Sequence, residues 1–285
     1  MTNNVMEVRE LSLDSYANRS GYDPDFMGNK FPLPHISDKL KNDITPLKDN
    51  SGYELKYSNF SVVMSKSRNL AILTGVNIDG TQLQDLTRKN DFWYYDPRIE
   101  KKYQYGPELY ANNDLDRGHL VRRLDPVWGS SALVANEDTF HFTNCSPQHK
   151  NLNQKTWLDL EEYILQNTNK HNLKVNVFTG PIFRSDDVLY RGKFQIPAEF
   201  WKVAVMIKDN NDISATGYLQ TQKNLLIDLE FAFGNYKTYQ VPLRKIESLT
   251  NLNFGNLHSF DPITNLEGLE GEIARVISNS GDIIL

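Results

Sequence analysis

Runs of apolar residues predict β-strands in two parts of the chain. Residues 57–77 contain β-branched and aromatic runs on both sides of a turn-like Ser-Lys-Ser at positions 65–67, which is the pattern of a β-hairpin. Residues 174–183, 200–208 and 213–220 are short apolar runs of the kind that buried strands show. We therefore expect an early hairpin followed, much later in the chain, by several buried strands.

Helical periodicity is clearest over residues 152–166, which are rich in good helix formers. The apolar side of this predicted helix consists of Trp157, Leu160, Ile164 and Leu165. A short helix is also predicted at residues 242–250, because Pro242 stands where a first helical turn tolerates a missing N–H. The order of strands, loop, helix and further strands predicts an α+β fold with a central antiparallel or mixed sheet flanked by helices.

Two segments lack clear periodicity. Residues 1–52 are polar and interrupted by glycine and proline, so we expect an irregular N-terminal arm with few strands of its own. Residues 82–114 are aromatic and charged, and they predict a long ordered loop, a feature that is often functional. The sequence shows no internal repeat, heptad pattern or low-complexity tract. We therefore expect an arm followed by a single domain over residues 53–285.

The composition is that of an ordinary globular protein, with 285 residues of which 39% are hydrophobic and 24% charged. A chain of this size can bury a substantial core without disulfides. Its single cysteine, Cys145, has no partner for an intramolecular disulfide, and the polar first ten residues lack the basic and apolar regions of a secretory signal. No apolar run approaches the roughly 18 residues of a membrane-spanning helix. We expect a cytoplasmic protein that does not associate with membranes.

The formal net charge of −5 argues mildly against a nucleic-acid partner, because neutralising phosphates is the main sequence-independent source of such binding. A local basic patch can nevertheless exist within an acidic protein. Basic residues do concentrate around the middle of the chain, at Arg88, Lys89, Arg98, Lys101, Lys102, Arg117, Arg122, Arg123, Lys150 and Lys155. For any one of them taken singly, a solvated surface charge is an equally good interpretation.

The segment Asp116-Arg117-Gly118-His119 places an acid, a guanidinium, a permissive glycine and an imidazole side by side. A histidine suits the deprotonation of water at neutral pH, because its unperturbed pKa lies close to the working pH. Arginine matches phosphate oxygens with a planar fork, and glycine lets the backbone approach a substrate closely. By residue types alone, a surface turn with a capping aspartate is the better interpretation of this segment.

A second segment follows, with Phe-Thr-Asn-Cys-Ser-Pro-Gln at 142–148 and Leu-Asn-Gln at 152–154. Within the predicted helix, Asn153, Trp157 and Glu161 are spaced four apart and share one face. Magnesium takes oxygen ligands and keeps several waters, so an amide and a carboxylate on one face suit it. For the helix in isolation, a capping Asn153 and a solvated Glu161 are the simpler interpretation.

Taken together, the two segments resemble the DNA/RNA non-specific endonucleases, a group of ββα-metal nucleases that includes endonuclease G. The signature of that family is DRGH, then TN-x-x-PQ, LNQ and W-x-x-LE, and every part stands here in the same order with matching spacing from Asn144 to Glu161. Weaker echoes occur at Arg88, at 179–181 and at 200–202, so the resemblance covers about residues 53–254. It implies a ββα-metal nuclease fold.

The resemblance implies a role for each motif residue. His119 would be the general base, Asn153 would bind Mg²⁺ directly, and Glu161 would orient water on the metal. Mn²⁺ is an alternative metal.

Supporting roles in catalysis fall to three further residues. Arg117 would fix the active-site loop or a phosphate, Asn144 would position His119 or substrate, and Arg88 would stabilise charge on the scissile phosphate. Arg98 is the rival for the role of Arg88, because the spacing from Arg88 to Phe92 varies in the family. Basic neighbours assigned to substrate binding are Arg122, Arg123, Lys155 and Arg98.

Three nearby residues match no catalytic position of the family. Cys145 lies inside the motif, where a buried packing thiol is the better interpretation. His141 and His149 flank the same stretch, and we interpret both as structural or as lying at the substrate rim.

The sequence therefore predicts a magnesium-dependent endonuclease that hydrolyses DNA and RNA to 5′-phosphate and 3′-hydroxyl ends, with recognition through phosphates rather than bases. A non-catalytic nucleic-acid-binding module is one alternative, although it would have no need of His119 and Asn153 together. The other alternative is a nuclease effector of a regulated defence or toxin system, held inactive by the arm or by a partner. A homodimer or a regulatory partner protein is compatible with either nuclease interpretation.

Overall fold

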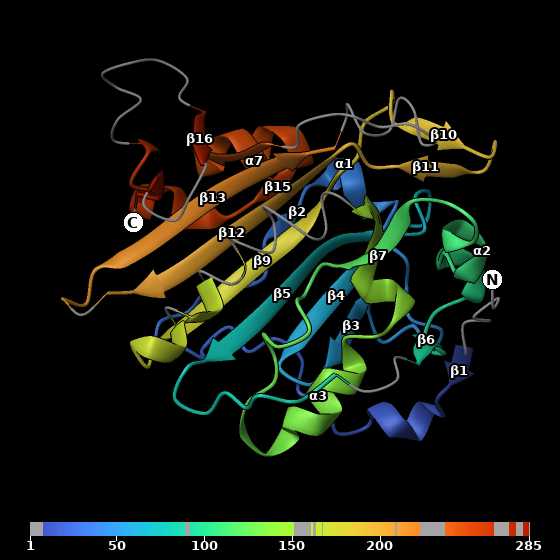
Figure 1. Cartoon of the computed structure of the whole chain (residues 1–285), viewed down its shortest axis with the longest axis horizontal. Coiled ribbons are helices and arrows are strands. Elements are labelled where there is room, and N and C mark those ends of the chain that lie inside the picture. The colour runs from blue at the N-terminus through green and yellow to red at the C-terminus, as the bar shows by residue number, and fades with distance from the viewer. Residues whose placement is uncertain are drawn as a thin grey trace.

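The computed structural model of the 285-residue chain describes residues 8–88, 92–150, 161, 164–166, 168–208, 210–222, 237–264, 274–277 and 282–284. A long antiparallel sheet runs through the middle of the described molecule (Figure 1). Across the sheet the strands are β16 (Arg275–Ile277), β14 (Lys237–Val241), β13 (Ile213–Thr221), β12 (Glu199–Ile207), β9 (Lys174–Ile182), β5 (Ala71–Asp79), β4 (Phe60–Met64) and β3 (Glu54–Tyr57). Every pairing between these neighbours is antiparallel.

The strands of this sheet confirm most of the expected pattern. The three buried runs predicted in the second half of the chain are β9, β12 and β13, and the predicted hairpin is β4 with β5. The predicted α+β fold with a central sheet is confirmed, and the sheet is antiparallel rather than mixed. Periodicity succeeded here because these strands are nearly continuous apolar runs, as strands buried on both faces require.

Helices are fewer than strands in the described residues. The predicted short helix is confirmed as α7 (Leu243–Thr250), with Pro242 at its N-cap and a left-handed Asn251 ending it. Glu161 and residues 164–166 and 168–170 are helical, whereas most of the helix predicted at 152–166 lies outside the described residues. No helix among the described residues is long and apolar enough to cross a membrane.

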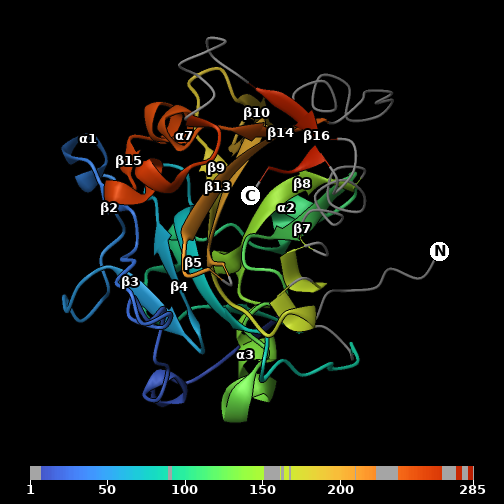
Figure 2. The same cartoon turned by 90° about the vertical axis from the view of Figure 1, so that its left-hand side faces the viewer.

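Each face of the sheet buries its own apolar cluster. Because side chains alternate along a strand, Phe200 and Ala204 of β12 pack on one face with Leu120. Trp201 and Val203 pack on the opposite face, where α7 lies. Figure 2 shows the arm elements α1 (Asp38–Lys41) and β2 (His35–Ile36) with α7 on one side of the sheet, and β7 (Leu115–His119) and β8 (Cys145–His149) on the other. The sheet therefore separates this arm side from a second side, on which the DRGH segment lies together with Tyr16 from the start of the arm.

The arm is anchored at many points although it has little regular structure. Its elements are β1 (Val8–Glu10), η1 (Leu13–Tyr16), β2 (His35–Ile36) and α1 (Asp38–Lys41). Tyr22, Phe31 and Ile36 are buried in the same cluster as Trp201 of the sheet. Gly21 has a φ of +78°, and an added Cβ would lie 2.8 Å from Ser61 Oγ, so this close crossing requires glycine.

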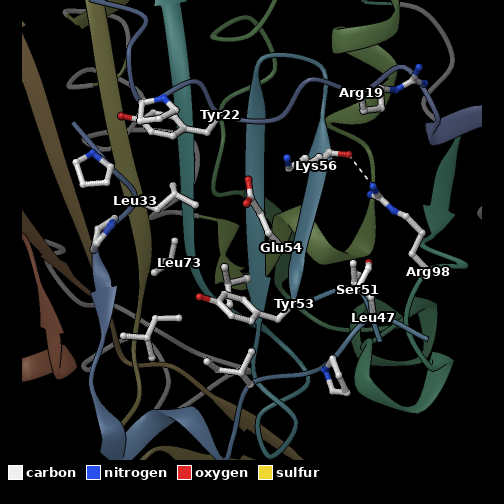
Figure 3. Close-up of a pocket in the computed structure, with 18 of the residues that line it drawn as sticks. Arg19, Tyr22, Leu33, Leu47, Ser51, Tyr53, Glu54, Lys56, Leu73 and Arg98 are labelled. Atoms are coloured by element: carbon white, nitrogen blue, oxygen red, sulfur yellow. Dashed lines mark hydrogen bonds between the residues drawn. The ribbon is translucent and has the colours of Figure 1, made fainter. Parts of the chain in front are cut away.

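A cavity of about 1160 Å³ lies between the arm and strands β3 to β5 (Figure 3). Tyr22, Leu33 and Leu73 form its apolar part, and Glu54 and Lys56 lie toward its polar part. Its lining residues come from the arm, from β3 to β5 and from the loop that follows residue 95. The cavity thus belongs to the arm side of the sheet.

The region predicted as one long loop, residues 82–114, is interrupted by short elements. Among them, β6 (Trp93–Tyr95) pairs in parallel with β1 of the arm. Periodicity could not reveal this pairing, because it joins segments far apart in the chain. Two further short elements of this region are η2 (Lys101–Tyr103) and α2 (Pro107–Tyr110).

Short elements also occur later in the described chain. They are β7 (Leu115–His119), η3 (Gly129–Ser131), α3 (Ala132–Asp138), η4 (Phe142–Asn144), β8 (Cys145–His149), β10 (Val188–Tyr190), β11 (Phe194–Ile196), β15 (Leu252–Asn253) and η5 (Gly255–Phe260).

Candidate active site

The two sequence motifs meet in a small antiparallel ribbon of β7 and β8, outside the main sheet (Figure 2). In its register, His119 lies opposite Cys145 and Arg117 lies opposite Pro147. The DRGH segment is therefore a strand, and its partner is the strand that carries the Ser-Pro-Gln part of the second motif. Alternation along β7 puts His119 and Arg117 on the same face of the ribbon.

Glycine at position 118 is required by packing. A Cβ added to Gly118 would overlap the amide of Gln148 on the neighbouring strand. Gln148 is fully buried, and neither its amide oxygen nor its amide nitrogen has a hydrogen-bond partner among the described residues. The glycine thus admits a buried amide whose hydrogen-bonding capacity is unused.

Asn144 fixes the backbone that follows the histidine. Its Nδ2 donates to the carbonyl oxygens of Val121 and Thr139, both at 3.0 Å, and its Oδ1 accepts from the Val121 N–H at 3.0 Å. The Leu120 N–H donates to the Asn144 carbonyl at 2.9 Å. Because this side chain is fully buried and bonded to backbone on both sides, its contribution is to hold His119 and its successors in place.

His119 sits in an aromatic pocket. Its ring centroid lies 5.4 Å from Trp93 and 5.2 Å from Phe140. Its Nε2 is buried and has no hydrogen-bond partner among the described residues. Burial, and next to it the charges of Arg88, Arg123 and Arg117, lower the pKa of His119 to about 3. The imidazole is therefore neutral at physiological pH, which is the form that can accept a proton.

Three arginines lie close enough to act on this histidine. Arg88 is exposed, with its guanidinium carbon 5.8 Å from the Phe140 ring, and Arg117 lies 4.9 Å over Trp93. Arg123 donates to the Leu86 carbonyl at 2.9 Å. Their combined positive charge is an environment suited to a phosphate group.

Glu161 has a partner that sequence reasoning missed. Lys202 Nζ lies 3.2 Å from Glu161 Oε1 and 3.1 Å from Thr179 Oγ1, and the lysine side chain is only 1% exposed. A lysine inside the apolar run of β12 is the signal that could have revealed it, because such a side chain is rarely buried without a charged partner. The sequence indicated Lys202 only as part of the weaker similarity to the family at residues 200–202.

A buried carboxyl group, Asp125, belongs to the same charged neighbourhood. Burial raises the pKa of Asp125 to about 7, while Lys202 and Arg122 act to lower it and Glu161 acts to raise it. Asp125 therefore holds its proton more tightly than an ordinary aspartate. Sequence reasoning gave no role to Asp125, because nothing in its neighbours predicted burial.

The structure places Arg98 away from the group around His119. Its guanidinium binds both carboxylate oxygens of Asp96, donates to the Lys56 carbonyl at 2.7 Å, and lies 4.1 Å over the Tyr16 ring. These partners tie strand β3 and the arm together, so they favour an anchoring role for Arg98 over the predicted contact with substrate.

Two predicted site residues, Asn153 and Lys155, lie outside the described residues, and the direct metal ligand is one of them. Among the residues that are described, no group of three or more His, Cys, Asp or Glu side chains is placed to hold a metal ion. Glu161 Oε1 is a buried carboxylate oxygen whose partner within the described part of the chain is the Lys202 ammonium, at 3.2 Å. It is an oxygen donor of the kind that a hard divalent cation and its waters prefer.

The other residues of this region have packing roles. His141 is fully buried; its Nε2 is 2.7 Å from the Tyr16 hydroxyl and its Nδ1 is 2.8 Å from the Asp138 carbonyl. Cys145 is buried as well, and burial raises the pKa of its thiol to about 12. A thiol with so high a pKa is a packing group rather than a nucleophile.

Comparison with known proteins connects this geometry to a family. The family model for DNA/RNA non-specific endonucleases matches residues 41–259. The chain is 40% identical over 260 residues to the uncharacterized protein y4fB of Sinorhizobium fredii, an alignment that spans 84% of this chain and 39% of that protein. The chain thus spans about two fifths of the length of that relative.

Two further relatives have nuclease names. Nuclease C1 of Cunninghamella echinulata var. echinulata is 25% identical, over 80% of this chain and 91% of its own length. The mitochondrial nuclease of Saccharomyces cerevisiae is 26% identical, over 45% of this chain and 38% of its own length.

Among solved structures, the fold resembles a chain in the crystal structure of the EndoG/EndoGI complex. The TM-score is 0.57 at 17% sequence identity, covering 70% of this chain and 84% of that one. This similarity confirms the predicted ββα-metal nuclease fold. Because the family model spans most of the chain, and because both motifs meet in one ribbon, this chain belongs to the DNA/RNA non-specific endonuclease family.

Proposed function

We propose that the protein is a magnesium-dependent, sugar-non-specific endonuclease with His119 as its general base. The observation that carries this proposal is the buried Nε2 of His119, which has no hydrogen-bond partner among the described residues although three arginines surround the ring. Buried polar atoms are normally hydrogen-bonded, so an exception beside cationic groups indicates a position reserved for an incoming group. A water molecule next to a phosphodiester fits that position.

In the proposed reaction, His119 takes a proton from water as the water oxygen attacks phosphorus in line with the departing 3′ oxygen. The bond from phosphorus to that oxygen breaks, so the products carry a 5′-phosphate and a 3′-hydroxyl. Arg88 and Arg117 would hold the phosphate oxygens and stabilise the charge that develops on them. Their charge also depresses the pKa of His119, and an arriving phosphate would offset it, making the base stronger when substrate is bound.

Members of this family depend on a metal ion, and we propose Mg²⁺, with Mn²⁺ as a substitute. Asn153 would supply the direct ligand, and Glu161 would hold surrounding waters by its carboxylate. When bound, the ion supplies positive charge for the transition state and acidity for the departing oxygen. The Glu161 carboxylate supports this proposal, because it is an oxygen donor that Lys202 holds in place through an ion pair to Oε1 at 3.2 Å.

We expect a broad range of substrates, because the side chains assigned to substrate binding contact phosphates and not bases. The assigned groups are arginines and lysines that meet phosphates, namely Arg88, Arg117, Arg122, Arg123 and Lys155. Contacts to the backbone carry no base identity, so supercoiled plasmid, linear duplex, single-stranded DNA and RNA should all be cut. A homodimer, a regulatory partner, a cytoplasmic location and a place in a defence or toxin system stay predictions from the sequence.

The test is to digest these four substrates at equal phosphate concentration, with Mg²⁺ and with excess EDTA, and to map the ends. We expect all four to be cut with Mg²⁺, none with EDTA, and activity to return with Mn²⁺. His119→Ala, purified in the same way, controls for a contaminating nuclease. Full activity in EDTA, one sharp recognition sequence, or ends with a 3′-phosphate would each contradict the proposal.

A further inference from the structure

A second pocket adjoins His119 and has no role in the reaction described above. It has a volume of about 570 Å³ and lies between the loop that precedes β6 and helix α3. Phe140 forms part of its wall and also packs edge-on against the His119 ring at 5.2 Å. Arg88 and Arg123, which act on His119, line the pocket too. We call it the Phe140 pocket.

The walls of the Phe140 pocket combine flat apolar surface with positive charge. Phe92, Tyr94 and Phe140 contribute aromatic rings. Leu133 of α3 also lines it and is 69% exposed, so it adds apolar surface that a ligand can cover. A pocket built only for phosphates would have no use for these apolar walls. A planar aromatic ligand with a phosphate attached would use both.

Two carboxylates refine the chemistry of the ligand. Asp85 and Glu137 lie at the pocket, and both are exposed. They would repel a second phosphate inside it, whereas they can accept hydrogen bonds from the N–H and NH₂ groups on the edge of a nucleobase. The arginines of the lining therefore suit a phosphate, and the aromatic rings together with the two carboxylates suit an uncharged base.

The pocket is held in shape by protein contacts. Arg123 Nη1 donates to the Leu86 carbonyl and to Asn136 Oδ1, both at 2.9 Å, so it joins the loop to helix α3. Tyr94 is fixed by stacking on His141, with centroids 5.4 Å apart. A preformed pocket of this kind binds a flat ligand without first having to order its own walls.

We propose that the Phe140 pocket receives one unpaired nucleobase of the strand that is being cut, adjacent to the phosphate at His119. This proposal rests on the proposed nuclease function and adds a subsite to it. Any of the bases fits the requirement, because every base has a π-face to stack, so the subsite is compatible with cleavage at many sequences. It also predicts faster cleavage of single strands than of duplexes, since a paired base must first leave its stack.

The first test measures binding without cleavage. Adenosine 5′-monophosphate and ribose 5-phosphate are titrated into the protein in EDTA by calorimetry. We expect the nucleotide to bind about tenfold more tightly, the lower end of what stacking of one base provides. Leu133→Ser should remove most of that preference. Leu189→Ser is the matched control, because Leu189 is also exposed, at 57%, and does not line the pocket.

The second test uses single-stranded DNA oligonucleotides with one abasic position moved along the strand. With Mg²⁺, kcat/KM for cleavage at a given phosphate should fall about tenfold when the missing base is the one at the pocket, and little at other positions. Leu133→Ser should lose this position dependence, whereas Leu189→Ser should keep it.

The two tests separate failure of the subsite from failure of the nuclease function. Equal binding of nucleotide and ribose phosphate, or abasic sites tolerated equally everywhere, would overturn the subsite and leave a phosphate-binding cleft. A clear preference for the nucleotide in EDTA, together with no cleavage of any substrate, would support the pocket and overturn the nuclease proposal instead.

Discussion

Two histidines in one layer of this molecule have opposite surroundings. His141 belongs to what we call the anchoring cluster, which consists of Tyr16, Asp96, Arg98, Asp138 and His141. The two ring nitrogens of His141 lie next to the Tyr16 hydroxyl and the Asp138 carbonyl. His119 is also enclosed by aromatic rings, yet its Nε2 has no hydrogen-bond partner among the described residues. Both imidazoles are held neutral, because burial lowers the pKa of each.

The difference lies in the charge placed around each ring. Asp96 and Asp138 act on His141, and the same Asp96 is bound by Arg98, so the charges of the anchoring cluster balance internally. Within the described part of the chain, the charges that act on His119 are those of Arg88, Arg123 and Arg117. A network with balanced charges holds elements together, whereas a group of like positive charges attracts an anion. The contrast separates the part of this layer that maintains the fold from the part that acts on substrate.

Replacing His119 should give the largest effect on cleavage. His119→Ala should lower the rate of cleavage by about a hundredfold to ten-thousandfold, which is the usual worth of general acid–base assistance. Its melting temperature should fall only slightly, because the lost Nε2 has no hydrogen-bond partner among the described residues and the main cost is the ring packing against Trp93 and Phe140. Initial rates on plasmid and a thermal melt of the same preparation test both statements. Near wild-type cleavage by this variant would remove the base assignment.

The next largest contrast should come from Arg98 and Arg88, which the sequence offered as rivals for one role. Arg98→Ala leaves the buried Asp96 carboxylate without its partner, which should cost about 3 kcal/mol of unfolding free energy in urea. Arg88→Ala should leave stability unchanged and weaken nucleic-acid binding, with the slope of log K against log salt shallower by about one. If instead Arg98→Ala changes the salt slope and spares stability, Arg98 belongs to the substrate surface as the sequence suggested.

A smaller change probes the anchoring cluster alone. Tyr16→Phe removes only the hydroxyl that lies 2.7 Å from His141 Nε2, so it should lower the unfolding free energy by about 1 kcal/mol. Cleavage by the folded variant should match the wild type, since neither group touches substrate. Urea midpoints and initial rates measure the two quantities. A large loss of rate without a loss of stability would show that the arm acts on the catalytic site itself.

The smallest expected effect is on the pH dependence of stability. The folded pKa of His119 is about 3, below the ordinary value of 6.5, so its contribution is fully present above pH 6.5 and is lost as the pH falls. Between pH 7.5 and pH 6, His119→Ala should therefore lose less stability than the wild type, by under about 1 kcal/mol. Urea midpoints at both pH values provide the measurement, and identical slopes for the two proteins would contradict the lowered pKa.

The sequence predicted the motif residues of the site better than it predicted the residues packed around them. The motif with His119 and the motif with Asn144 are local patterns, and the structure brings both into the ribbon of β7 and β8. Lys202 and Asp125 were missed, because their effect depends on burial against residues from distant segments. Arg98 was grouped with the basic patch because nothing in its sequence neighbours shows that Asp96 binds it through both carboxylate oxygens.

By itself, the sequence determined the strands β9, β12 and β13, the helix α7, the α+β class and the family, because apolar periodicity and motif spacing are local properties of the chain. Only the tertiary structure decided that the arm packs into the core, that β1 pairs with β6, and which buried nitrogens find partners. The physical reason is that burial and charge balance are set by neighbours in space. His119 and His141 therefore have different roles, because the fold places different charges and hydrogen-bond partners around the two rings.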